Sequence, residues 1–235
     1  MTENVQSVRV QLDEGRSVSA LLQNPAGARA CHVFAHGAGA DMSHRFMQAV
    51  SAGLAERGIA TLRYQFLYSE LGSKRPDMPA VAHKAVRAAV ATAFQLTRLP
   101  LIAGGKSFGG RMTSQAQAKE PLPEVRGLAF LGFPLHAPDK PSIERGAHLA
   151  DVRVPMLFIQ GTRDKLADLS LLRPLIAELG DRASLNTIEH ADHGFDVLVR
   201  SGRKPEDVMT EVLDAFAAWV ATLLAATGSR IPNIG

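Results

Sequence analysis

The segment LIAGGKSFGGRM, residues 101–112, decides how the rest of this chain can fold. It opens with a short apolar run, which is typical of a buried strand, and closes with residues compatible with a helix. Between them stands the pattern G-x-S-x-G, with Gly105 and Gly109 on either side of Ser107. A strand that turns sharply into a helix crowds the backbone two residues either side of the turn, where glycine is needed. The segment therefore predicts a strand, a tight turn and a helix, with the Ser107 hydroxyl exposed at the helix N-terminus.

The remainder of the chain alternates between short β-rich runs and longer segments with apolar residues at helical spacing. This alternation is typical of an α/β protein with a mostly parallel, twisted sheet and helices on both faces. Residues 5–12 and 17–22 differ, because only a short turn cluster separates them, and they predict an antiparallel hairpin at the sheet edge. Further strands are expected at 31–35, 60–64, 101–104, 128–131, 156–160 and 184–188, and the main helices at 43–56, 79–96, 169–179 and 206–226.

Composition fits one globular domain over residues 1–235, with a flexible tail at 227–235. The chain is 46% hydrophobic and 21% charged, which excludes disordered, collagen-like and disulfide-scaffold classes. Its 26 Lys and Arg residues are scattered and nearly balanced by 23 Asp and Glu, so we expect no nucleic-acid partner. No signal-peptide pattern opens the sequence, and its longest mostly apolar stretch, residues 216–226, is shorter than the roughly 20 residues of a membrane crossing. We therefore expect a cytoplasmic protein with no membrane partner.

Ser107 needs a base and an acid, because a serine hydroxyl is a weak nucleophile at neutral pH. On this kind of turn the partners follow in the order acid, then histidine. Asp164 follows the strand expected at 156–160, so it lies on the same sheet edge as Ser107. His193 lies in the loop between the last strand and the closing helix. The sequence thus predicts a catalytic triad of Ser107, Asp164 and His193.

Other residues of the same types compete for these roles. We prefer His193 to His190 because Gly194 gives its turn freedom, whereas His190 still belongs to the strand end. Asp168 is expected to cap the helix that follows it, and Asp192 to shape the histidine loop.

The segment HGAGAD, residues 36–41, is expected to supply part of an oxyanion hole. Its small residues allow backbone N–H groups to approach a substrate closely. We predict the N–H groups of Ala38 and Phe108 as the two donors, with Gly37 as an alternative to Ala38. A loop that merely caps the next helix is the other interpretation.

The same glycines do not fit a phosphate-binding loop. A P-loop would place Pro100 where its first glycine belongs, and a dinucleotide fingerprint would place Met42 where its third glycine belongs. The three histidines His32, His36 and His44 lie on different elements, without a carboxylate at helical spacing. We therefore expect no metal and no cofactor.

Two long connections, residues 65–78 and 133–150, are candidates for the pocket wall, because long loops in compact domains tend to be functional. Neither is long enough for a large helical lid, so we expect an open pocket. Loop packing is the alternative role for their side chains. The residues predicted to line the pocket are Phe66, Tyr68, Phe133 and His136.

Three segments, FAHGAGADM (34–42), GGKSFGGR (104–111) and ADHGF (191–195), resemble those of α/β-hydrolases, and the resemblance extends along nearly the whole chain. The small size without a cap resembles the dienelactone-hydrolase-like branch. The segments are similar to a group related to testis-expressed-protein-type and NSL-complex-subunit-type hydrolase domains. The resemblance implies the α/β-hydrolase fold and the triad named above. Dienelactone hydrolases carry a cysteine nucleophile where this chain has Ser107, so their substrate is not carried over.

These features predict a serine hydrolase that cleaves small carboxylic esters with short to medium acyl chains through an acyl-enzyme. Two alternatives stay open: a binding scaffold with an inactive triad, and an acyltransferase that uses the same residues. Lys106 and Arg111 flank the serine, and we expect them to be solvated surface charges. Attraction of a substrate carboxylate is their alternative role.

Overall fold

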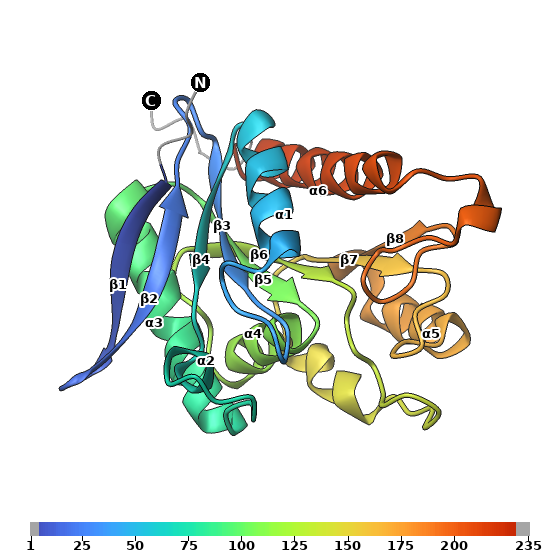
Figure 1. Ribbon diagram of the computed structural model, residues 1–235, viewed down its shortest axis with the longest axis horizontal. Coiled ribbons are helices and arrows are strands. Elements are labelled where there is room, and N and C mark those ends of the chain that lie inside the picture. Colours follow the sequence, from blue (N-terminus) through green and yellow to red (C-terminus); the bar gives the residue numbers. More distant parts are fainter. Residues whose placement is uncertain (1–4, 229–235) are drawn as a thin grey trace, which may run out of the picture.

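The computed structural model describes residues 5–228, which form one eight-stranded sheet with helices on both faces (Figure 1). The strand order is β1-β2-β4-β3-β5-β6-β7-β8. The β1–β2 and β2–β4 pairs are antiparallel, and all other neighbours are parallel. The predicted parallel sheet with an antiparallel edge hairpin is therefore confirmed. The strands are β1 (Val5–Asp13), β2 (Arg16–Gln23), β3 (Ala30–Ala35), β4 (Ile59–Tyr64), β5 (Leu101–Lys106), β6 (Val125–Leu131), β7 (Met156–Gly161) and β8 (Ala183–Ile188).

Two helices cover one face of the sheet and three cover the other. α1 (Arg45–Glu56) and α6 (Pro205–Gly228) pack on the first face, and α3 (Pro79–Thr97), α4 (Phe108–Lys119) and α5 (Leu169–Leu179) pack on the second (Figure 1). Alternate residues of the central strands enter different cores, because successive side chains of a strand point to opposite faces. In β3, Val33 joins the core under α3 and α4, and Phe34 joins the core under α1 and α6.

The two long connections contain short helices that the sequence pattern did not predict. α2 (Leu67–Glu70) lies in the first, and the 3-10 helix η1 (Glu144–Asp151) lies in the second. There are two further 3-10 turns: η2 (Gly180–Arg182) directly precedes β8, and η3 (Val199–Ser201) lies between β8 and α6. These elements are too short to show helical periodicity in the sequence.

α6 is longer than expected at both ends. It continues through Gly228, two residues into the segment expected to be a tail, and residues 229–235 lie outside the described residues. Over Pro205–Ala226 it is also long and apolar enough to cross a membrane, and it is the one helix of the described chain that meets these criteria. A helix packed on the sheet of a globular core meets the same criteria. Its buried stripe, which includes Val212, Phe216 and Val220, packs on the sheet.

Candidate active site

Ser107 stands at the predicted turn between β5 and α4, with φ 50° and ψ −116°. A positive φ is costly for a residue with a side chain, so the surrounding structure must hold it. The flanking glycines allow this approach of the backbone. A Cβ at Gly105 would lie 2.2 Å from the carbonyl oxygen of Ala35, and one at Gly109 would lie 2.6 Å from the same oxygen. The predicted strand, turn and helix are all present.

A chain of hydrogen bonds connects Ser107 to two residues that are far away in sequence. The Ser107 Oγ lies 2.8 Å from Nε2 of His193, and Nδ1 of His193 lies 2.7 Å from Oδ2 of Asp164. Because a carboxylate only accepts hydrogen bonds, Nδ1–H donates to Asp164, which leaves the Nε2 lone pair to accept the serine O–H. The structure thus brings together the three residues predicted as a triad, from the ends of β5 and β7 and the loop after β8.

Asp164 is fixed by donors other than the histidine. Its side chain is fully buried, its Oδ1 accepts the backbone N–H of Leu166 at 2.8 Å, and its Oδ2 also accepts the side-chain amide of Gln160. Gln160 is itself buried, and its Oε1 accepts the N–H of Phe133 at 2.9 Å. Gln160 was not predicted. A polar residue at the end of the buried strand β7 was the signal that could have found it.

The loops that carry the acid and the histidine touch each other closely. A Cβ at Gly161 would lie 2.3 Å from the carbonyl oxygen of Ala191, and the N–H of Arg163 donates to the same oxygen at 2.8 Å. Only glycine fits at position 161, and its lack of a side chain allows the Asp164 and His193 loops to meet.

The competing residues take the roles predicted for them. Asp168 caps α5 by accepting the N–H of Ser170 at 2.8 Å, and Asp192 accepts the N–H groups of Gly194 and Asp196 within its own loop. His190 is exposed, at the turn that ends β8.

The loop after β3 faces Ser107 and is held by two aromatic residues. Nε2 of His36 accepts the N–H of Phe66 at 3.2 Å, so its Nδ1–H donates to the carbonyl oxygen of Gly37 at 2.9 Å. The Tyr68 hydroxyl donates to the same oxygen at 3.3 Å. Burial lowers the pKa of His36, which favours the neutral ring that this arrangement requires. Gly37 and Ala38 line a cleft together with Ser107.

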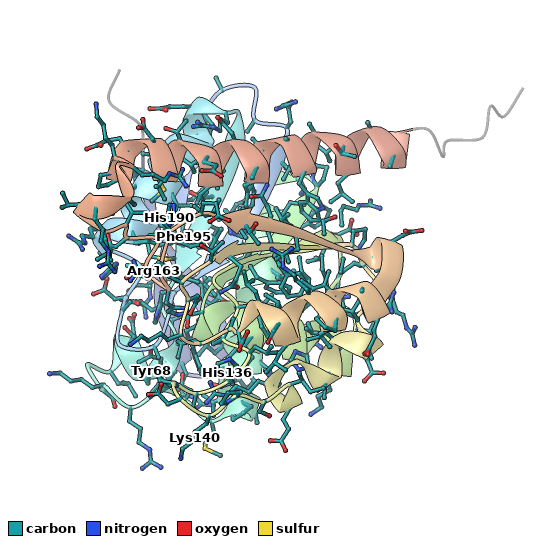
Figure 2. All side chains as sticks on the ribbon, turned by 90° about the vertical axis from the view of Figure 1, so that its right-hand side faces the viewer. Tyr68, His136, Lys140, Arg163, His190 and Phe195 are labelled. Atoms are coloured by element: carbon teal, nitrogen blue, oxygen red, sulfur yellow. The ribbon has the colours of Figure 1, made fainter. Side chains whose placement is uncertain are left out.

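The cleft beside Ser107 has a volume of about 790 Å³, and its wall differs from the one predicted. Phe66, Tyr68, Phe133 and His136 do not line it, and all are at least 95% buried elsewhere. Figure 2 shows Tyr68 and His136 well apart from Phe195, which does line it. The apolar side chains of the wall come from α1, the acid loop, the histidine loop and the start of α6, and they are Phe46, Met47, Leu166, Phe195, Pro205 and Met209.

The four predicted wall residues are buried because neighbouring side chains and backbone groups of the core hold them there. Phe66 packs against Phe108 with ring centroids 5.3 Å apart, and Phe133 packs against Phe158 at 5.6 Å. His136 accepts the N–H of Asp168 on Nε2 at 2.9 Å. These four residues therefore belong to the packed interior and do not line the cleft.

Both charges that flank the serine depart from the prediction of solvated surface charges: Arg111 is partly buried, with its Nε unpaired among the described residues, and a larger departure is seen for Lys106. It lines the cleft, and its ammonium donates a hydrogen bond to the backbone carbonyl of His193. Arg111 lies on α4 outside the cleft lining, where burial lowers the pKa of its guanidinium. Lys106 is therefore not a solvated surface charge. Lys106 is the last residue of β5, and its side chain extends from the strand end to the histidine loop, where the ammonium binds the His193 carbonyl.

A family model described as alpha/beta hydrolase domain matches residues 28–221 of the chain. The chain belongs to this family. The match spans every element that carries a residue of the hydrogen-bonded chain, from β3 to most of α6.

Solved α/β hydrolases share the fold over nearly the whole chain. A dienelactone hydrolase from Anabaena variabilis matches with a TM-score of 0.74 and 22% identity, covering 93% of this chain and 97% of that one. A serine hydrolase without a lid from Xanthomonas campestris gives 0.70 and 17%, covering 93% and 96%. The esterase domain of a Rhodothermus marinus protein gives 0.69 and 19%, covering 92% and 97%. The similarity confirms the α/β-hydrolase fold.

Within this hydrolase fold, no cluster of three or more His, Cys, Asp or Glu side chains suited to a metal occurs in residues 5–228. None of the three histidines considered as ligands, all within the described residues, belongs to such a cluster. His32 and His36 are buried on β3 and just after it, and His44 caps α1 by accepting the N–H of Phe46 at 3.3 Å.

Proposed function

We propose that the protein is a serine hydrolase that cleaves small carboxylic esters through an acyl-enzyme on Ser107. The observation that carries the proposal is the unbroken hydrogen-bonded chain from Ser107 through His193 to Asp164. Such a chain lets a neutral imidazole take the serine proton while the carboxylate stabilises the imidazolium that forms. The similarity of the motifs at 34–42, 104–111 and 191–195 also leads us to infer kinship with the testis-expressed-protein-type and NSL-complex-subunit-type group.

In the first half-reaction, Ser107 Oγ attacks the ester carbonyl carbon and its proton moves to Nε2 of His193. The carbonyl electron pair becomes an oxyanion, which accepts hydrogen bonds from the N–H groups of Ala38 and Phe108. Position 108 begins α4, so the helix dipole adds to this stabilisation. The intermediate collapses as the C–O bond to the alcohol breaks, and Nε2 returns the proton to the departing alkoxide.

In the second half-reaction, water attacks the acyl-enzyme. His193 takes a proton from the water, a second oxyanion forms at the same donors, and the bond to Ser107 Oγ breaks. The proton passes back from Nε2 to the serine, and the carboxylic acid leaves. Asp164 keeps the same imidazole tautomer in both halves.

The cleft supports a preference for short to medium acyl chains. Its volume of about 790 Å³ lies in the range of ordinary small-molecule pockets, and its wall carries apolar side chains. The two long connections contribute no residue to the lining, although these are the segments that could have formed an amphipathic cover. A long acyl chain would therefore leave much of its apolar surface in water.

Labelling with a fluorophosphonate probe, followed by hydrolysis of p-nitrophenyl esters graded by acyl length, tests the proposal. The wild-type protein should be labelled at Ser107 and should hydrolyse the shorter esters, and Ser107→Ala should do neither. Ser114→Ala is the matched control, because Ser114 on the same helix also pairs with a histidine, His148, at 2.7 Å. A wild-type protein that is neither labelled nor active would point to a binding scaffold. Labelling with acyl transfer only to an added alcohol or amine would point to an acyltransferase.

A further inference from the structure

Lys106 connects the serine turn to the histidine loop. It is the residue before Ser107, and its ammonium donates to the carbonyl oxygen of His193. The nitrogen also lies 5.6 Å from the ring centre of Phe46 and 5.1 Å from that of Phe195. These two rings stack at 5.9 Å with their planes 8° apart, one from α1 and one from the histidine loop.

The backbone around the ammonium is shaped to receive it. A Cβ at Gly132, after β6, would lie 2.7 Å from Nζ of Lys106 and 3.4 Å from the ring of His193. A side chain at position 132 would thus displace the ammonium, while the ring of His193 would lie at ordinary contact distance. The ammonium lies between the end of β6, the stacked rings and the histidine loop, and Lys106 also lines the cleft.

We propose that Lys106 is a positioning residue that fixes the histidine loop against the nucleophile turn, so that His193 stays within reach of Ser107. The proposal rests on the function proposed above. His193 is carried by a loop with two residues of left-handed backbone, His190 (φ 64°) and Phe195 (φ 66°). The His193 side chain is held by its bonds to Ser107 and Asp164, and the bond from Lys106 additionally holds the His193 backbone carbonyl. A general base must keep its geometry within fractions of an ångström, and an ammonium bound to its own carbonyl restrains it directly.

The charge of Lys106 makes this contact dependent on pH. Burial lowers the pKa of the amine to about 8, against the opposing attraction of Asp164, Asp192 and Asp196. His193 also faces it, and α1 contributes His44 and Arg45 to the same cleft. Below about pH 8 the ammonium makes a charge-assisted hydrogen bond and favourable contacts with two aromatic rings. Above that pH the neutral amine can still donate, but the bond loses its charge assistance and the contacts with the rings lose the cation, so the turnover of the wild-type protein should fall as the pH rises through about 8.

Lys106→Met tests this role, with Lys119→Met as the matched control, since Lys119 is exposed near the end of α4. Lys106→Met should lower kcat about a hundredfold at pH 7 with a much smaller change in KM, as expected for a base displaced by about 1 Å. Its melting temperature should stay near that of the control, because the lost hydrogen bond to the His193 carbonyl is offset by removal of a partly buried charge. The fall in turnover near pH 8 should be present in the wild-type protein and in Lys119→Met, and absent from Lys106→Met.

Equal kcat in Lys106→Met and Lys119→Met, or the same alkaline fall in both, would overturn the proposal. If Lys106→Met does not fold, Lys106→Arg decides, because arginine stays charged throughout. Turnover of Lys106→Arg that no longer falls near pH 8 supports the role, and an unchanged fall overturns it. Fluorophosphonate labelling separates this proposal from the one before it. A wild-type protein that is not labelled refutes the hydrolase, and equal labelling rates in the wild-type and Lys106→Met proteins refute only the role of Lys106.

Discussion

His32 should make the folded protein sensitive to mild acid. The residue is fully buried on β3, between the rings of Phe34 and Phe216, each with its centre 4.8 Å away. Its Nδ1–H donates to the carbonyl oxygen of Ile102 at 3.0 Å, and its Nε2 is buried with no hydrogen-bond partner among the described residues. Burial lowers the pKa of His32 to about 4.

The size of the effect follows from the difference between the two states. An unfolded histidine has a pKa of about 6.5, so the unfolded chain binds a proton first as the pH falls. The contribution of neutral His32 to the free energy of unfolding is fully present above about pH 6.5. It is lost progressively down to about pH 4, where the folded state also binds the proton. At 1.36 kcal/mol for each pKa unit, His32 alone should remove roughly 3 kcal/mol of unfolding free energy over this interval.

Urea denaturation of the wild-type protein and His32→Leu at several pH values between 4 and 8 measures this contribution. Leucine is close to histidine in volume and cannot be protonated, and groups common to both proteins cancel in the difference. At pH 7 the variant should be less stable by about 1–3 kcal/mol, because the Ile102 carbonyl loses its donor. The two curves should approach each other as the pH falls. Parallel curves from pH 7 to 4 would refute the reasoning, and the exposed His190→Asn should follow the wild-type curve.

Three further outcomes are expected. His193→Ala should lower ester turnover by about 10⁴-fold or more. His190→Asn changes an exposed turn and should leave turnover nearly unchanged. The reverse ranking in the same assay would show that His190 is the base. Soluble esters of short and medium acyl chains should be hydrolysed faster than emulsified long-chain esters, with no jump in rate at the interface; faster cleavage of the emulsions would mean that a segment folds over the cleft. Gly109→Ala should cost about 1–3 kcal/mol in urea denaturation and should also reduce turnover, because the added Cβ meets the backbone at the end of β3; unchanged stability would contradict the crowding at the turn.

The parts of the site that the sequence predicted are those encoded by local pattern. The turn at Ser107 needs glycine at two fixed distances, so its geometry is written in a few adjacent residues. His193 could be chosen over His190 because Gly194 follows it, and strand ends gave the edge on which Asp164 lies. These three side chains do lie within hydrogen-bond distance, and their catalytic role stays a prediction.

The cleft wall and Lys106 depended on tertiary packing and could not be predicted in the same way. Phe46 and Phe195 belong to segments far apart in the sequence, and only the packing of α1 beside the histidine loop stacks their rings. Phe66 and Phe133 follow strands just as Asp164 does, yet they turn into the core. Position after a strand therefore indicates the edge of the sheet, while the direction of each side chain is set by its neighbours.

The separation of the cleft wall from the hydrogen-bonded chain has a consequence for how such a protein can be altered. Ala49 on α1 and Met209 on α6 line the cleft, whereas Ser107 and Asp164 belong to the ends of the central strands. Under the proposed function, substitutions at 49 and 209 should change which acyl group is accepted while Phe46, Phe195 and Lys106 keep their contacts at the histidine loop. A combinatorial library confined to these two positions should yield variants with shifted substrate preference, and natural divergence could follow the same route to new substrates while one reaction mechanism persists.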